Sequence, residues 1–171
     1  MFHKTIKLII AFLLIAFGIY QIVDRSTGNG IFLIFISFIF IFLYFKNEFI
    51  LLAFLKLRKQ DMAGAKSWLD RIKNPETALV QKQQGYYNYL NGIMVSQTNL
   101  TLAEKFFKKA IQLGLSMDQD LALAKLQLAG IALSKRRKIE ATKYLNEAKK
   151  LDKQNMLKEQ VDMLKQQLKK I

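Results

Sequence analysis

Residues 103–110 read AEKFFKKA, and the same spacing recurs at residues 65–72, AKSWLDRI, and at residues 141–148, ATKYLNEA. In each stretch an alanine is followed four residues later by a large apolar residue and seven residues later by Ile or Ala. The spacings of four and seven place these positions on one face of a helix. The stretches lie 38 residues apart, and a repeat of this length is typical of stacked helical arrays rather than of a catalytic domain.

Few residues in the chain interrupt helices. It contains one Pro and 8 Gly in 171 residues, which favours helix almost throughout. It contains no Cys, which excludes disulfides and thiolate metal sites and fits a reducing compartment. The predicted fold class is therefore all-α.

The first quarter of the chain is strongly apolar. Residues 6–23 contain Lys7 as their one charged residue, and residues 31–45 contain none. Both stretches approach the length that crosses a bilayer, since about 20 helical residues span about 30 Å. A polar turn, residues 24–30, connects them. The sequence therefore predicts a transmembrane helical hairpin in residues 1–45, with spans at about 6–23 and 30–45.

Two other interpretations of these apolar stretches are open. The first stretch could be a signal peptide, although no small-x-small cleavage pattern precedes the turn. Both stretches could instead be core helices of a soluble domain. The second stretch, however, has no polar face to present to water, which favours the membrane hairpin.

Basic residues flank the hairpin on the side away from its turn. Lys4 and Lys7 lie at the start of the first span, and further basic residues follow the second span: Lys46, Lys56, Arg58 and Lys59. The turn contains Arg25, which Asp24 offsets. The positive-inside rule then predicts both termini and residues 46–171 in the cytoplasm. The predicted localisation is the bacterial inner membrane, as a multi-pass protein.

The second repeat unit extends backward from residues 103–110. Its characteristic residues are the aromatic Tyr87, then Leu90, Ala103, Phe107 and Ala110. This pattern resembles the tetratricopeptide repeat, which has an aromatic residue, a Leu, an Ala, a second aromatic residue and a second Ala in this order. The resemblance continues in the other two units, with Leu128, Ala141, Leu145 and Ala148 in the third and Ala65 and Leu69 in the first.

The resemblance covers about residues 46–153 and implies a solenoid of about three helix pairs. Residues 155–171 carry apolar residues among Lys and Gln and are expected to form a terminal helix that covers the open end. The family period is about 34 residues, whereas this period is longer by about one helical turn. The Pro that follows the second helix in the family is missing in all three units. Residues 46–171 are thus predicted to form one TPR-like cytoplasmic domain.

Local signals agree with helix pairs. Asp61 is expected to cap the helix that carries residues 65–72, and Gly114 is expected to end the helix at residues 100–113. Thr101 and Glu104 have the spacing of a capping box. The first repeat helix follows the second span after residues 46–48 and is expected to be continuous with it, or barely kinked.

No catalytic site assembles in the sequence. The one histidine, His3, has no carboxylate or serine partner nearby, and no Gly-rich phosphate loop is present. Asp118 and Asp120 fit the first turn of a helix, where acidic residues complement the dipole, better than a metal site. We therefore expect no enzyme activity, no cofactor and no metal.

Two groups of residues are candidates for binding. The concave face of the array would contain Asn88, Gly92, Ser96, Gly130 and Ser134. These small and polar residues suit either a bound partner helix or packing within the stack.

The second group is the basic run Lys135-Arg136-Arg137-Lys138, in the turn of the third pair. It could be a solvated loop, a contact with anionic lipid headgroups or a contact with RNA phosphates. Aromatic residues are not interleaved with these charges, so base-specific recognition is not expected.

The expected function is that of a non-enzymatic adaptor or scaffold. It would be an accessory subunit of an inner-membrane complex and bind a protein partner at the cytoplasmic face. The alternative is a basic tether that holds a polyanion such as the ribosome at the membrane, for example beside a protein-translocation channel. Nucleic acid would then be contacted through the ribosome alone. The sequence leaves the partner and the oligomeric state open.

Overall fold

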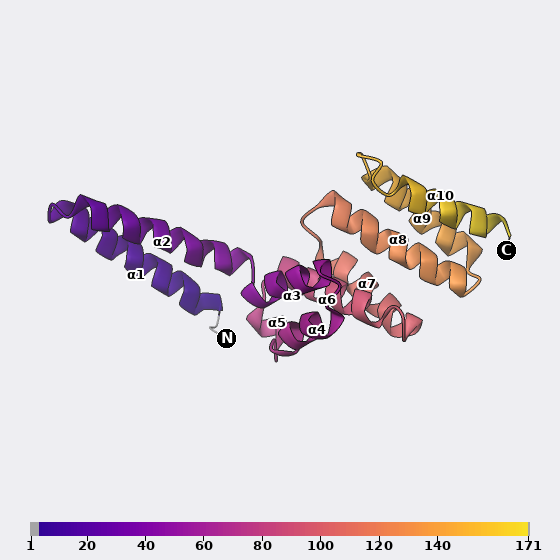
Figure 1. Ribbon diagram of the computed structural model, residues 1–171, viewed down its shortest axis with the longest axis horizontal. Helices are drawn as coiled ribbons and strands as arrows, with labels where there is room; N and C mark the ends of the chain where they lie inside the picture. The colour runs from indigo at the N-terminus through magenta and orange to yellow at the C-terminus, as the bar shows by residue number, and fades with distance from the viewer. Residues whose placement is uncertain (1–3, 171) are drawn as a thin grey trace. The chain divides into compact units, whose positions relative to one another are not determined.

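The computed structural model describes residues 4–170, and over that range it contains helices and no strand (Figure 1). The prediction of an all-α fold is therefore confirmed. The chain divides into two compact units, Met1–Gln83 and Gln84–Ile171. The first unit holds the apolar hairpin together with the first helix pair, and the second holds the other repeats.

The first unit begins with two long apolar helices, α1 (Lys4–Val23) and α2 (Thr27–Phe45), which lie side by side in Figure 1. Both are long and apolar enough to cross a membrane. A Cβ added at Gly30 would lie 2.5 Å from the carbonyl oxygen of Gly18, so glycine allows the two backbones to approach closely. Only 17% and 11% of the residues in the two apolar segments are buried, which argues against core helices of a soluble domain.

Lys7 is buried within the apolar part of α1. Its ammonium donates to the carbonyl oxygen of Leu43 at 3.2 Å and pairs with the carboxylate of Glu48. An unpaired charge in an apolar hairpin costs free energy, and pairing Lys7 with Glu48 reduces this cost. The same contact joins the base of α1 to the first residue of α3 (Glu48–Arg58).

Helix α2 does not continue into α3. Lys46 has extended backbone, and the side-chain oxygen of Asn47 accepts from the N–H groups of Phe49 at 3.0 Å and Ile50 at 3.4 Å. The prediction of a continuous or barely kinked helix is therefore wrong, because Asn47 caps a new helix.

The first helix pair consists of α3 and α4 (Met62–Asp70). The ring of Phe49 stacks on that of Trp68, with 5.8 Å between centroids. The predicted cap Asp61 is confirmed, since its carboxylate accepts from the N–H of Gly64 at 2.7 Å. A short helix, α5 (Pro75–Ala78), follows before α6 (Gln81–Val95).

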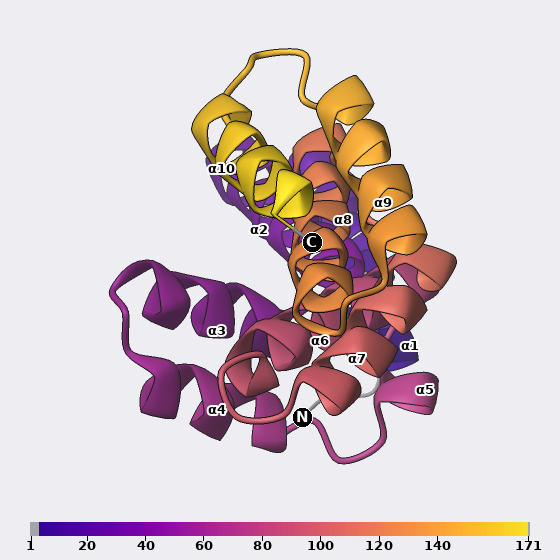
Figure 2. The same ribbon diagram turned by 90° about the vertical axis from the view of Figure 1, so that its right-hand side faces the viewer.

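The second unit begins within α6, at Gln84. It continues with α7 (Leu100–Leu113), α8 (Asp118–Ser134), α9 (Lys138–Leu151) and α10 (Lys158–Lys169). Helix α8 is apolar on nearly all sides and contacts α7, α9 and α10 (Figure 2). One buried cluster joins α8, α9 and α10, and it includes Leu126, Leu133, Leu145, Val161 and Leu168. Helix α10 thus covers the core face of α8 and α9, as predicted for the terminal helix. Gly114 ends α7 with φ 91°, as predicted.

The helix boundaries in the structure repeat with the same 38-residue period as the sequence. The second helix of each pair begins at Met62, Leu100 and Lys138, which are 38 residues apart. Gln60 and Arg136, two periods apart, both adopt the left-handed conformation, with φ of 59° and 55°. Both donate their N–H to the carbonyl three residues earlier, at 2.9 Å. The first and third turns are therefore built alike.

The residues predicted to pack the repeats lie in the interiors of the two units. Ten of them are at most 1% exposed: Ala65, Leu69, Leu90, Ala103, Phe107, Ala110, Leu128, Ala141, Leu145 and Ala148. Tyr87 is half-buried. The small residues of the repeat therefore lie where neighbouring helices meet.

Gly85 and Gly130 provide a matched pair of substitutions. A Cβ at Gly85 would lie 2.3 Å from the carbonyl oxygen of Gly114, whereas a Cβ at Gly130 meets nothing within 4 Å. Gly130→Ala is expected to raise the free energy of unfolding by about 0.5–1 kcal/mol, because alanine favours helix. Gly85→Ala is expected to lower the free energy of unfolding by about 2 kcal/mol, because the backbone at Gly114 must shift to make room for the methyl group. Urea unfolding in mild detergent, followed by circular dichroism, compares them, and equal effects would contradict the close approach at Gly85.

Candidate interaction surfaces

The residues predicted for the concave face separate into two groups, of which the first is packed within the chain. Asn88 is buried, and its amide nitrogen donates to the carbonyl oxygen of Gln84 at 2.7 Å. A Cβ at Gly92 would lie 2.9 Å from the ring of Phe107. The hydroxyl of Ser96, which follows the end of α6, donates to the carbonyl oxygen of Ile93 at 2.7 Å. For Asn88 and Gly92 the geometry favours packing within the stack over partner binding.

The second group lies on an accessible face of α8. Gln127, Gly130 and Ser134 are three, four and seven residues apart and therefore share one side of the helix. Gln127 and Ser134 are exposed, and the space beside Gly130 is open. We call these three residues the open face of α8. It is the part of the predicted groove that a partner could reach.

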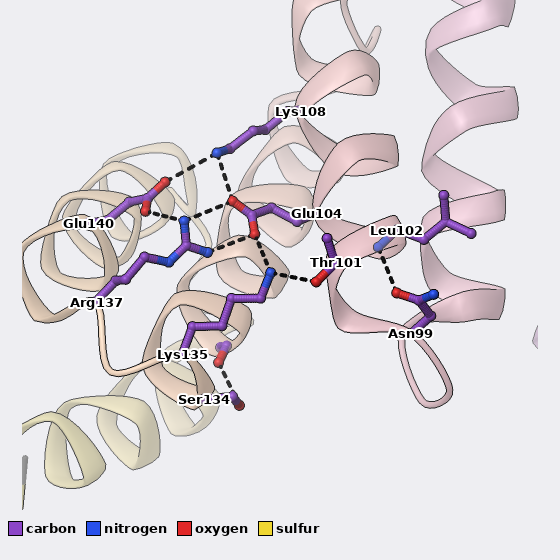
Figure 3. A network of polar contacts seen from close by, with 10 residues as sticks. Asn99, Thr101, Leu102, Glu104, Lys108, Ser134, Lys135, Arg137 and Glu140 are labelled. Atoms are coloured by element: carbon purple, nitrogen blue, oxygen red, sulfur yellow. Dashed lines mark hydrogen bonds and ion pairs between the residues drawn. The ribbon is translucent and has the colours of Figure 1, made fainter.

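Half of the basic run is engaged by a single acidic residue of α7 (Figure 3). Arg137 donates to both carboxylate oxygens of Glu104, at 3.0 and 2.7 Å. Lys135 donates to Glu104 at 2.8 Å, and Lys108 donates to it at 2.7 Å. A two-point arginine–carboxylate contact is among the stronger polar interactions in proteins. Glu104 thus ties α7 to the turn between α8 and α9.

Glu140 completes this network from the first turn of α9. Its carboxylate lies 2.7 Å from Arg137 and 3.3 Å from Lys108. We call the five residues Glu104, Lys108, Lys135, Arg137 and Glu140 the Glu104 clamp. The Arg137 guanidinium, followed by the two lysines, holds the pKa of Glu104 well below its usual range against the opposing effect of burial. Glu104 therefore remains ionised at neutral pH.

The remaining cations of the basic run point outward. Arg136 and Lys138 are exposed, and the neighbouring Ile139 is 89% exposed. The same surface includes Lys143, one turn further along α9. Of the four basic residues predicted to meet a polyanion or lipid, Arg136 and Lys138 are thus the two accessible ones in the described chain.

The capping box predicted for Thr101 and Glu104 is wrong. Asn99 caps α7 instead, since its side-chain oxygen accepts from the N–H of Leu102 at 2.9 Å. Glu104 turns toward the cations of the next repeat. The one signal in the sequence is that Glu104 is the single acidic residue of a lysine-rich helix.

Asp120 has a role that the sequence did not reveal. It is buried in the first turn of α8 and accepts the O–H of Tyr86 at 2.6 Å. The tyrosine oxygen in turn accepts from the N–H of Ser116 at 3.2 Å. Burial and the nearby Asp120 raise the pKa of Tyr86 to about 12. This contact links α6 to the start of α8 and is structural rather than catalytic in geometry.

Residues 4–170 contain no group of three or more His, Cys, Asp or Glu side chains placed to hold a metal ion. His3 lies outside the described residues. In the Glu104 clamp each carboxylate meets a cation of the chain itself.

No protein-family model, no curated protein and no solved structure matches this chain.

Proposed function

We propose that this protein is a non-enzymatic adaptor anchored in the bacterial inner membrane. Its apolar hairpin spans the bilayer, and its helix pairs bind a protein partner at the cytoplasmic face, as an accessory subunit of a membrane complex. The observation that carries the proposal is the junction between hairpin and repeats. Lys46 and Asn47 alone separate α2 from α3, so the first helix pair stays within a few ångströms of the end of the span.

The helix pairs support a tetratricopeptide-like solenoid. Three second helices begin at a constant period, small residues are buried in each, and α10 covers the last pair. Solenoids of this kind offer an extended face to partners. We assign that role to the open face of α8, where a bound helix would meet small side chains.

A substitution at Gly130 tests this assignment. Because the space beside it is open, Gly130→Tyr should leave the fold intact and obstruct the open face of α8. After crosslinking in native membranes, recovery of the partner is expected to fall roughly tenfold, which corresponds to about 1.4 kcal/mol of binding. The control Gln166→Tyr, on the exposed side of α10, should leave recovery unchanged. A monodisperse monomer with no partner after mild solubilisation would contradict the proposal.

Single-cysteine labelling tests the membrane topology, since the chain has no Cys of its own. Gly28→Cys lies in the first turn of α2, next to the connection between the two spans, and an added Cβ there meets nothing within 4 Å. A membrane-impermeant maleimide should label it in intact spheroplasts. Gln166→Cys should react only after the membrane is opened, because the proposal places the repeats in the cytoplasm. Equal labelling of both positions from outside would contradict this orientation.

The alternative function, a tether for a polyanion such as the ribosome, is supported by the net charge of +14. Its predicted contact is weakened by the Glu104 clamp, which pairs Lys135 and Arg137 with a carboxylate of the same chain. We therefore propose the adaptor function rather than the polyanion tether.

A further inference from the structure

Ile139 is an unusual residue at the surface of the second unit. It lies in the first turn of α9, and its exposure of 89% is higher than that of the other large apolar side chains in the described chain. Three basic residues, Arg136, Lys138 and Lys143, border the same open hollow, together with clamp residues. An exposed isoleucine by itself has no evident structural role. An isoleucine surrounded by cations is suited to a binding partner whose surface is anionic and whose interior is apolar.

The exposed cations beside Ile139 differ from the cations of the clamp, which are paired with carboxylates. Arg137 and Glu140, which also line the hollow, pair with each other and with Glu104 and Lys108. The side chains of Arg136, Lys138 and Lys143 are exposed. The hollow therefore presents an excess of three positive charges around one apolar side chain.

The clamp also fixes the shape of this surface. Arg137 and Lys135, on either side of Arg136, are both bound to Glu104. Arg136 itself adopts φ 55° and donates its N–H to the carbonyl oxygen of Leu133 at 2.9 Å. Lys135 and Arg137 thus fix the turn on both sides of Arg136, whose own side chain is exposed. Such a rigid presentation reduces the entropy lost on binding.

We propose that Arg136, Lys138, Ile139 and Lys143 form a contact site for anionic phospholipid at the membrane surface. The cations meet the phosphate headgroups, and Ile139 enters the boundary between headgroups and acyl chains. The proposal rests on the membrane anchoring in the proposed function, which keeps lipid at high local concentration. It gives the second unit its own attachment to the bilayer, separate from the hairpin.

Lipid fits this surface better than RNA does. Phosphate contacts with RNA use cations, and single-stranded bases stack on aromatic rings. None of the residues of this surface is aromatic. RNA has no extended apolar region against which the exposed isoleucine could be buried. An anionic bilayer satisfies both the charge and the apolar side chain.

A fluorescent label near Ile139 tests the site in the full-length protein. Thr142→Cys, one turn along α9 and exposed, carries an environment-sensitive dye. The protein is incorporated into nanodiscs of phosphatidylcholine alone, or of equal parts phosphatidylcholine and phosphatidylglycerol. In the anionic discs we expect a blue shift of emission and quenching by phosphatidylcholine brominated on its acyl chains. In the neutral discs we expect neither.

A triple variant with a matched control assigns the effect to the site. Arg136→Gln, Lys138→Gln and Lys143→Gln together should abolish the shift. Gln at position 136 is compatible with the turn, because Gln60 has the same conformation in the first pair. Lys149→Gln, Lys150→Gln and Lys169→Gln remove the same charge from other exposed positions and should preserve the shift. Ile139→Ser should reduce the acyl-chain quenching more than the blue shift.

Three results would overturn the proposal. They are equal emission in the two kinds of disc, a shift that survives the triple variant, or a shift produced by polyuridylate but not by anionic lipid. The last result would assign the surface to RNA. Protein that enters neither kind of disc would instead contradict the membrane anchoring, so the two proposals fail in distinguishable ways.

Discussion

Glu104→Gln is expected to lower the free energy of unfolding of the second unit by about 3 kcal/mol. The side chain of Glu104 is 11% exposed and contacts three cations, Lys108, Lys135 and Arg137. Glutamine keeps the size of the side chain but removes one of the two carboxylates of the clamp. Glu140, which contacts Arg137 and Lys108, is then the counter-charge left for three cations. The loss should exceed that of an ordinary surface ion pair, which contributes about 1 kcal/mol or less.

Urea unfolding of the full-length protein in mild detergent, followed by circular dichroism, measures this loss. Glu159→Gln is the control, since it is exposed in the first turn of α10, and it should change stability by less than about 0.5 kcal/mol. Adding Arg137→Gln to Glu104→Gln should cost less than the sum of the single changes. An effect of Glu104→Gln no larger than that of the control would contradict the clamp.

The same substitution should alter the dependence of stability on pH. Because its cations hold the pKa of Glu104 well below the usual range, the unfolded chain takes up this proton first as the pH falls. The contribution of the clamp is therefore complete above the unfolded pKa of about 4.3 and is lost progressively below it. Glu104→Gln should flatten this acidic limb, and a limb that is unchanged in the variant would assign it to other carboxylates.

Phe107→Ala is expected to lower the free energy of unfolding by about 4 kcal/mol. Phe107 is fully buried, lies edge-on to Tyr89 with 6.0 Å between ring centroids, and fills the space that Gly92 leaves. Because a glycine already faces the ring, the site has little side chain with which to collapse into the cavity. Thermal and urea unfolding measure the loss.

Two variants make this prediction specific. Phe107→Leu, which installs the residue found at the same place in the other two repeats, should cost less than about 1.5 kcal/mol. Phe106→Ala, at the half-buried neighbour, should cost clearly less than Phe107→Ala. Equal losses at positions 106 and 107 would contradict the placement of Phe107 in the interior.

Local signals in the sequence predicted much of the fold. The cap at Asp61 and the end of α7 at Gly114 depend on neighbours within a few residues, and both appear in the structure. The helix starts at Met62, Leu100 and Lys138 follow the 38-residue period because the same local pattern recurs in each repeat. The break at Asn47 was also within reach, because Asn before Glu is a common start of a helix. The apolar residues on either side of Asn47 favour one continuous helix and mask this signal.

The Glu104 clamp could not be predicted in the same way. Its contacts join residues 31 and 33 positions apart in the chain, so they depend on how α7 meets the following turn. The two glycines Gly92 and Gly130 illustrate the same limit. They occupy equivalent places in consecutive repeats, yet one faces a phenylalanine ring and the other faces open space. The surroundings of a residue, and not its type, decide between packing and binding.

The way in which the core face of α8 is covered has a consequence for biosynthesis. A helix emerging from the ribosome can rest on the helices made before it, but the core face of α8 is completed by α9 and α10, which are made later. Until α10 has been translated, a leucine-rich surface of the second unit stays uncovered. Chaperones and proteases that recognise such surfaces would therefore distinguish an unfinished chain from a finished one.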